Sequence, residues 1–297
     1  MRACFLRLCR LLVVVMTLPL SVMEMAGFCD VYHRRLFPLL AFTITFSYND
    51  KVHRLKRELF RNMARFADSS GTLRLLEIGC GSGANFRFYP NGCTVTCTDP
   101  NPGFERYLRR NMDANKHVTY EGFLVVSGED LRGIQDESVD VVVCTLVLCS
   151  VKNVQKVLQE ARRVLRKGGA FYFLEHVISD SWWIYGCQYI FEPLWYYLGD
   201  GCKVTKATWK DLETAGFSEL YIRHVDVLEV SQMIRPHIVG YSIKHKYLLA
   251  VRRLSILKDG GALLSPSRVG HSDSLQSLNA FTAWRCQLDC PIWSDGN

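Results

Sequence analysis

The middle of the chain consists of short apolar runs separated by longer stretches of mixed character. Five runs have the length of single strands: residues 73–78, 94–98, 118–126, 139–146 and 170–174. Residues 103–115 and 154–165 instead carry apolar side chains at helical spacing, and the second of these helices is predicted to stop at Gly168-Gly169. Strands that alternate with helices predict a doubly wound, mostly parallel α/β sheet. The run 139–146 is nearly all apolar, as in a central parallel strand.

The first 48 residues are predicted to be a hydrophobic membrane-anchor region. They contain two apolar segments, Leu11–Met23 and Leu36–Tyr48, joined by basic residues. A spanning helix needs roughly 20 apolar residues, so the first segment is marginal and the second is too short to span alone. The region could span the bilayer, form a shallow hairpin or lie in one leaflet. A cleaved signal peptide remains the alternative, although Ser21-Val22-Met23 is a poor cleavage site.

The charge of the chain agrees with a membrane surface. The net charge is +7, and many basic residues border the apolar segments near the N-terminus. This placement favours anionic lipid over a nucleic-acid groove, so membrane lipid is an expected partner and nucleic acid is not. For residues 51–65 a solvated helix face explains the charges equally well.

Cysteine usage predicts a reducing compartment and no metal site. The chain has 12 cysteines, but none shows the CxxC spacing or the Cys-and-His pattern of a zinc site. Cys80, Cys144 and Cys149 are therefore interpreted as small core residues. The absence of an N-x-S/T acceptor is consistent with a cytosolic face.

The stretch LLEIGCGSGANF, residues 75–86, is the strongest functional motif. Three glycines after an apolar run predict a turn from strand to helix in which a nucleotide-like ligand lies against bare backbone. Asp99 follows the second strand, where a carboxylate accepts hydrogen bonds from ribose hydroxyls. The spacing E-x-G-x-G-x-G differs from the GxGxxG of nicotinamide enzymes, which disfavours an NAD-type oxidoreductase.

The motif resembles motif I of class I S-adenosylmethionine-dependent methyltransferases. Longer strings, among them GANFRFYPNGCTVTCTDPNPGFE, SVDVVVCTLVLCSVKN and RPHIVGYSIK, resemble the membrane-associated proteins called methyltransferase-like seven, over roughly residues 30–244. Those proteins are similar to alkyl thiol S-methyltransferases anchored in endoplasmic reticulum and lipid droplet membranes. The resemblance implies a Rossmann-like seven-stranded sheet, S-adenosyl-L-methionine as cofactor, a small hydrophobic thiol as substrate, and a catalytic domain that faces the cytosol.

The resemblance also implies roles for particular residues. Glu77, Gly79, Gly81 and Gly83 would frame the methionine and ribose of the cofactor, and Asp99 would hold the ribose. Gly128 and Glu129, in the string SGED, would lie at the adenine. For these last two an ordinary surface turn is nearly as good an explanation.

Methyl transfer to a thiol needs the thiolate as nucleophile. His176, at the end of the fifth strand, is the first candidate for a base or an electrostatic helper; satisfying strand-end hydrogen bonds is an equally good role for it. Weaker candidates near the same edge are Asp200, Cys202 and His237. Thr145 and Cys149 follow strand four, where core packing explains them as well as a role in the pocket wall.

Three parts of the chain follow from this reading: an anchor region (1–48), a class I methyltransferase domain (49–244) and a C-terminal extension (245–297) that is expected to be poorly ordered. Residues 181–197 are rich in tryptophan and tyrosine, which suits a cover over an apolar pocket or contact with a membrane interface. Two alternatives to thiol methylation remain open: another acceptor (amine, hydroxyl or lipid), and a non-catalytic membrane scaffold that binds the cofactor.

Overall fold

The computed structural model describes residues 2–27 and 31–245, so the predicted C-terminal extension lies almost wholly outside the described residues. Seven strands form one sheet in the order β3-β2-β1-β4-β5-β7-β6. Their bounds are β1 Arg74–Ile78, β2 Thr94–Thr98, β3 Thr119–Leu124, β4 Val139–Thr145, β5 Leu165–His176, β6 Glu219–Asp226 and β7 Pro236–Ile243. Strands β1 to β5 are parallel, and β7 runs antiparallel to both β5 and β6. The predicted doubly wound, mostly parallel sheet is confirmed.

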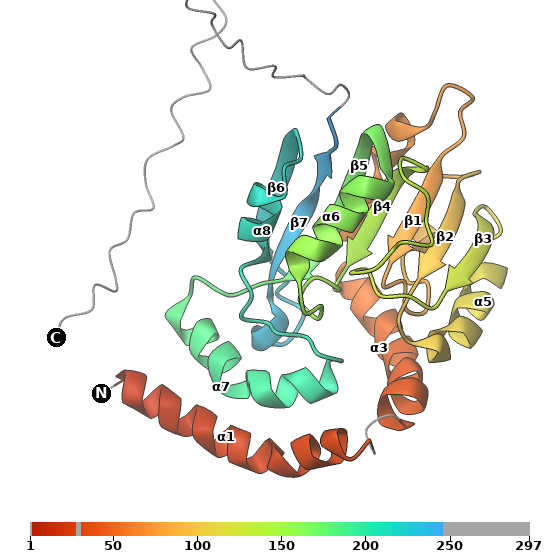
Figure 1. Ribbon diagram of the computed structural model, residues 1–297. Coiled ribbons are helices and arrows are strands. Elements are labelled where there is room, and N and C mark those ends of the chain that lie inside the picture. Colours follow the sequence, from red (N-terminus) through yellow and green to blue (C-terminus); the bar gives the residue numbers. More distant parts are fainter. Residues whose placement is uncertain (1, 28–30, 246–297) are drawn as a thin grey trace, which may run out of the picture. The chain divides into compact units, whose positions relative to one another are not determined.

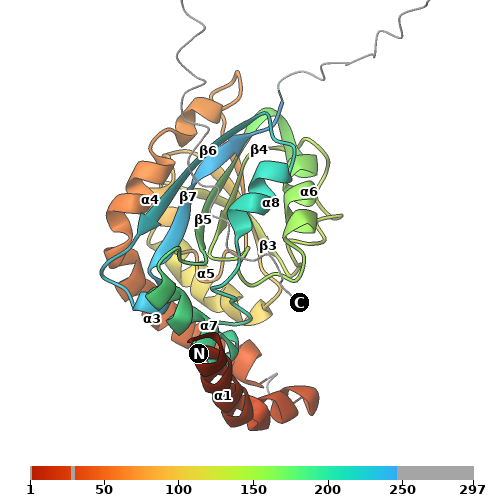
Figure 2. The ribbon, with the colours of Figure 1, turned by 90° about the vertical axis from the view of Figure 1, so that its left-hand side faces the viewer.

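Helices cover both faces of the sheet because neighbouring strand residues point to opposite sides. Leu75 of β1 packs in a cluster with residues of α4 (His53–Phe60) and α5 (Glu105–Asp113). Leu76, the next residue, packs with residues of α6 (Val154–Val164) and α8 (Thr208–Thr214). Figure 2 shows α4 and α6 on opposite sides of the sheet.

One buried carboxylate ties together the beginnings of three strands. Asp140 of β4 is fully buried and accepts hydrogen bonds from the backbone and guanidinium of Arg74, at the start of β1. It also pairs with Arg166 near the start of β5. These contacts lie at the amino ends of the strands, so the carboxyl ends remain available for a ligand.

The sequence predicts that Gly168 and Gly169 end a helix, and this prediction is wrong. Helix α6 ends at Val164, and Gly168 and Gly169 lie inside β5. Gly168 has a φ of 76°, and a Cβ on Gly169 would lie 2.7 Å from the carbonyl oxygen of Asp140. The pair therefore allows β5 to begin close against the backbone of β4.

The N-terminal region forms helices longer than its uncharged segments. Helix α1 spans Arg2–Met25 and α3 spans Phe37–Lys51, with the short π-helical segment Tyr32–Leu36 before α3. The stretch Ala3–Met25 is long and apolar enough to cross a membrane by length and composition, which is weak support for a membrane segment.

The aromatic segment after β5 is a helix, α7 (Trp182–Leu198), which lies alongside α1 (Figure 1). Arg10 of α1 lies 3.5 Å from the carboxylate of Glu192, and the hydroxyl of Ser21 lies 2.7 Å from that of Tyr197. The buried amide of Gln188 donates to the carbonyl of Val177, just after β5. Helix α7 is thus fixed to the carboxyl edge of the sheet, and α1 is fixed to α7.

Candidate active site

The loop after β1 has the conformation that its glycines predict. Gly79, Gly81 and Gly83 all have positive φ, at 61°, 51° and 78°. At Gly79 a Cβ would also lie 2.4 Å from a methyl carbon of Val147, in the turn after β4. The glycines thus allow the backbone to reverse within a few residues while the turn after β4 packs against it.

Asp99 lies beside this loop, directly after β2. Its carboxylate accepts hydrogen bonds from the backbone N–H groups of Gly81 (3.0 Å) and Asn101 (2.9 Å). Burial raises the pKa of Asp99 to about 7, and no cation pairs with it within residues 2–27 and 31–245. Each oxygen keeps a lone pair for a further donor, as a ribose diol requires.

Glu77 braces the loop from inside. Its two oxygens accept hydrogen bonds from the amide of Asn85 and the hydroxyl of Tyr89, both at 2.8 Å, and burial raises its pKa to about 7. Asn85 also donates to the hydroxyl of Thr145 at 2.9 Å, while its own Oδ1 is buried without a donor in the described part of the chain. An ammonium group bound here would satisfy that oxygen.

Helix α3 covers the glycine loop. This contact was not predicted, because residues 1–48 were interpreted as a membrane anchor. The amide of Asn49 donates to the carbonyl of Ala84 at 3.0 Å, and the buried ammonium of Lys56 donates to Asn49 at 2.8 Å. Before α3, the carbonyl of His33 accepts a hydrogen bond from the side-chain amide of Asn101. Nδ1 of the His33 ring lies 2.8 Å from Oδ1 of Asp200. Asp200 is therefore engaged with the covering segment.

Gly128 and Glu129 have structural contacts that explain their residue types. Gly128 is buried, and a Cβ there would lie 2.5 Å from a side-chain carbon of Ile78, at the end of β1. The carboxylate of Glu129 accepts a hydrogen bond from the backbone of Asn153, the residue before α6. The turn lies close to the end of β1; contact of either residue with an adenine stays a prediction.

His176, at the end of β5, lies in a buried cluster with two cysteines. Its Nδ1 is 3.6 Å from the sulfur of Cys202, which in turn is 3.2 Å from the sulfur of Cys149. The three residues are 6%, 4% and 1% exposed. The pKa of Cys202 lies well below its usual range, because Cys149 hydrogen-bonds to it and His176 lies beside it. His176, Cys149 and Cys202 were all candidates from sequence, and the fold brings them together.

His237 and Tyr48 lie against the same imidazole. The ring centres of His176 and His237 are 4.7 Å apart. His237 Nδ1 donates to the carbonyl of Arg235 at 2.8 Å, so its Nε2 accepts from the hydroxyl of Tyr48 at 2.6 Å. Burial lowers the pKa of His237 to about 3, which keeps this ring neutral. Sequence reasoning missed Tyr48, because it lies in a segment interpreted as an anchor.

Glu175 joins the cluster to the glycine loop. Its carboxylate accepts from the backbone N–H groups of Val147 (3.0 Å) and Cys149 (3.3 Å), and burial raises its pKa to about 7. Val147 packs on Gly79, and Cys149 lies two residues further on. A group bound at the glycine loop would thus lie close to the His176 cluster.

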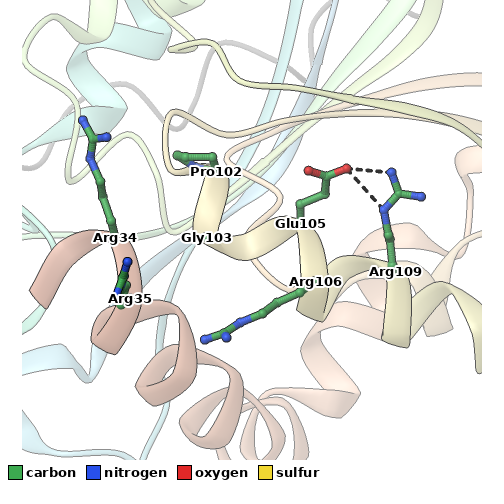
Figure 3. A pocket seen from close by; sticks show the side chains of 7 residues that line it. All are labelled: Arg34, Arg35, Pro102, Gly103, Glu105, Arg106 and Arg109. Atoms are coloured by element: carbon green, nitrogen blue, oxygen red, sulfur yellow. Dashed lines mark hydrogen bonds and ion pairs between the residues drawn. The ribbon is translucent and has the colours of Figure 1, made fainter. Parts of the chain in front are cut away.

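An open, basic groove lies outside this buried site. It has a volume of about 590 Å³ and is lined by Arg34, Arg35, Pro102, Gly103, Glu105, Arg106 and Arg109. Figure 3 shows that Arg109 is the arginine held by Glu105, whereas no hydrogen bond or ion pair joins the side chains of Arg34, Arg35 and Arg106 to the other residues drawn. The groove therefore presents net positive charge beside the turn that follows Asp99.

Comparisons with known proteins agree with this geometry. A family model for a methyltransferase domain matches residues 76–173. Human thiol S-methyltransferase TMT1A is 50% identical over 212 residues, covering 71% of this chain and 87% of the relative; human TMT1B is 48% identical, covering 80% and 98%. The chain belongs to the thiol S-methyltransferase family of class I methyltransferases. A solved putative methyltransferase, in complex with the Haloferax volcanii Trm112 activator, shares the fold, with a TM-score of 0.53 at 14% identity over 71% of this chain and 99% of that chain.

The site of this methyltransferase fits S-adenosylmethionine. The cofactor supplies a methyl group on a sulfonium, which is a good leaving group. Asp99 can accept from its ribose, the glycine loop leaves backbone free for close approach, and the unpaired Oδ1 of Asn85 can accept from its ammonium. The chain therefore provides complementary groups for the polar parts of the cofactor.

We expect Asp99→Ala to weaken S-adenosylmethionine binding about ten- to hundredfold, because hydrogen bonds to a charged acceptor contribute roughly 1.5–3 kcal/mol. Isothermal titration of the folded variants measures this. Asp113→Ala, an exposed carboxylate at the end of α5, is the matched control. Equal affinity of wild type and Asp99→Ala would remove Asp99 from the cofactor site.

Glu77 makes stability depend on pH. Its pKa of about 7 in the fold exceeds the roughly 4.3 of an unfolded glutamate, so the folded state binds more protons between these values. The free energy of unfolding should therefore fall as pH rises from 5 to 7, by at most about 1.4 kcal/mol per pH unit for this group. In thermal melts between pH 5 and 7, the stability of Glu77→Gln should fall less steeply with pH than that of wild type. The stability of Glu213→Gln, an exposed control, should fall as steeply as that of wild type. Parallel curves for wild type and Glu77→Gln would show that the carboxyl titrates in its usual range.

Proposed function

We propose that the protein transfers the methyl group of S-adenosylmethionine to a small hydrophobic thiol at a membrane surface. The observation that most directly supports a thiol acceptor is sequence similarity: enzymes named thiol S-methyltransferases are 50% and 48% identical to this chain over most of its length. The chemistry of the His176 cluster supports the same acceptor independently.

The surroundings of the cluster suit an uncharged, apolar acceptor. Cys149, Cys202 and Val204 form a buried group against which Trp195 and Ile234 pack. The neighbouring His237 is neutral, and Glu175 has both oxygens bound to backbone N–H groups. Because the carboxylate that contacts the cluster is already held by backbone N–H groups, a cationic amine bound here would lose its hydration without gaining a free counter-charge.

A thiol needs little help to become a nucleophile. With a pKa near 8.5, a few per cent of a free thiol is already ionised at neutral pH. His176 would assist, either by accepting the thiol proton or by stabilising the thiolate with its charge. An amine or hydroxyl acceptor, or a scaffold without turnover, are the alternatives.

The experiment that tests the acceptor is a comparison of thiols, amines and alcohols of matched carbon skeleton with methyl-labelled S-adenosylmethionine. Label transfer should be found with the apolar thiols and fall when the chain of the thiol carries a charge. Transfer only to amines or alcohols would reject the thiol acceptor. Cofactor binding without transfer to any compound would favour the scaffold.

The membrane part of the proposal rests on α1, α7 and the arginine groove. Trp182 and Trp183 at the start of α7 are 67% and 57% exposed, and much of the apolar surface of α1 is exposed as well. Tryptophan is enriched at bilayer interfaces, and arginines attract anionic headgroups. The proposed location is the endoplasmic reticulum membrane and lipid droplets, with the catalytic domain in the cytosol. Because α1 and α7 lie at the carboxyl edge of the sheet, an apolar substrate would enter from the lipid.

Deletion of residues 2–25, which form α1, should move much of the protein from membranes to the soluble fraction. The reason is the loss of the longest exposed apolar surface. The remaining membrane-bound fraction should fall further when Trp182→Ser and Trp183→Ser are added, whereas Tyr221→Ser, an exposed aromatic on β6, should have no such effect. Fractionation measures the distribution, and a titration with S-adenosylmethionine confirms that the variants are folded.

Full retention of the deletion variant on membranes would assign the anchor to other segments. Detection of a wild-type N-terminus cleaved after α1, by mass spectrometry, would instead identify a signal peptide.

A further inference from the structure

Three potential metal ligands converge behind the turn after β4. Cys149 lies in that turn, His176 at the end of β5 and Cys202 after α7, and their ligand atoms all lie within 4.8 Å of one another. All three side chains are buried. They are far apart in the sequence, so no spacing motif reveals them, and the sequence predicts no metal.

The separations of the ligand atoms fit zinc. With Zn–S of about 2.3 Å and Zn–N of about 2.0 Å, a tetrahedral ion places two sulfurs about 3.8 Å apart and a sulfur and nitrogen about 3.5 Å apart. The distance from Cys202 Sγ to His176 Nδ1 is 3.6 Å, and the distance from Cys202 Sγ to Cys149 Sγ is 3.2 Å. The two sulfurs need to separate, and the ligand atoms of Cys149 and His176 lie within 4.8 Å of each other. A disulfide, at about 2.05 Å, would instead require them to approach by more than 1 Å.

We propose that Cys149, His176 and Cys202 bind one Zn²⁺ ion, and that the fourth position of this ion takes the thiol acceptor as its thiolate. This inference rests on the function proposed above, and it assigns His176 the role of a zinc ligand in place of the base or electrostatic role given there. Three protein ligands with an open fourth position are typical of catalytic zinc, whereas structural zinc has four.

No fourth protein ligand competes for the open position within the part of the chain that the structure describes. Tyr48 and His237 are hydrogen-bonded to each other, and both oxygens of Glu175 bind backbone N–H groups. Glu175 also fixes the backbone of Cys149, as partners of ligating residues commonly do.

The cluster is also better explained as a metal site than as a packed polar core. The one hydrogen-bond partner of His176 Nδ1 among the described residues is the sulfur of Cys202. Buried polar groups normally have oxygen or nitrogen partners. The two cysteine thiolates balance the charge of one Zn²⁺, so only the charge of the fourth ligand is left in the loaded site.

The proposed step conserves atoms and charge. A zinc-bound hydroxide accepts the S–H proton of the entering thiol and leaves as water, which forms the Zn–S bond. A lone pair of this sulfur then forms the S–CH₃ bond while the bond from the methyl carbon to the sulfonium breaks, and its electron pair stays on the departing sulfur. The neutral thioether is a poor ligand, so water replaces it and loses a proton to solvent.

The metal content of the full-length protein tests the site directly. Protein purified in detergent should contain about one zinc per chain by plasma mass spectrometry, because three converging ligands bind zinc tightly. Cys149→Ser and Cys202→Ser should lose most of it. Cys187→Ser, which removes a cysteine of α7 outside the cluster, is the matched control and should keep it.

A second measurement covers the possibility that these variants misfold. Cys202→His preserves a ligand and should retain more zinc than Cys202→Ser, while both should bind S-adenosylmethionine as wild type does. In protein loaded with Co²⁺, the thiolate-to-cobalt charge-transfer band should intensify and shift when an alkyl thiol is added, and the corresponding alcohol should not change it.

The two proposals fail in different ways. Transfer to thiols by protein that contains no zinc and is unaffected by added zinc would overturn the metal site and leave the thiol function. A Cys149–Cys202 disulfide in the isolated protein, seen by peptide mass spectrometry, would also overturn it. Stoichiometric zinc without a cobalt response to thiols would reject the open position for the acceptor. Zinc in the site and transfer only to amines or alcohols would reject the thiol function itself.

Discussion

The arrangement of the site depends on how the turn after β4 is held. Its N–H groups at Val147 and Cys149 bind the buried carboxylate of Glu175, and its carbonyls at Leu148 and Val151 accept from the ammonium of Lys206, at 3.0 and 2.6 Å. Glu175 and Lys206 thus bind the two ends of the peptide unit between Leu148 and Cys149. Because the turn is fixed, Val147 can pack on Gly79 while Cys149 reaches His176, so one constraint shapes both the cofactor loop and the cluster.

Buried carboxyl groups concentrate at this edge of the sheet. Glu77, Asp99 and Glu175 are each nearly inaccessible, and burial raises the pKa of each to about 7. Each of the three accepts a protein hydrogen bond at both oxygens, and Asp99 is the one that lies beside the glycine loop, where a ligand could use its remaining lone pairs. A ligand bound at Asp99 would add hydrogen-bond donors to a buried carboxylate that has few. Cofactor binding should therefore raise the free energy of unfolding.

Local patterns in the sequence predicted the core of the fold but not how distant segments meet. The apolar runs located β1 to β5, and the glycine loop and Asp99 identified the cofactor edge, because each signal lies within a few neighbouring residues. The covering role of α3 depends on Asn49 reaching Ala84, and the packing of α1 on α7 depends on Arg10 reaching Glu192. No local spacing encodes such contacts. The same reason hid the convergence of Cys149, His176 and Cys202.

The position of α7 links membrane contact to chemistry. Its buried Gln188 donates to the carbonyls of Val177 and Val204, so the helix is fastened both to the end of β5 and to the segment that carries Cys202. Trp182 and Trp183, the first two residues of α7, are exposed. A shift of α7 would therefore be transmitted to the segment that carries Cys202, whose sulfur lies 3.6 Å from Nδ1 of His176. In this fold, the exposed tryptophans of α7 and the buried cluster around His176 belong to one connected unit.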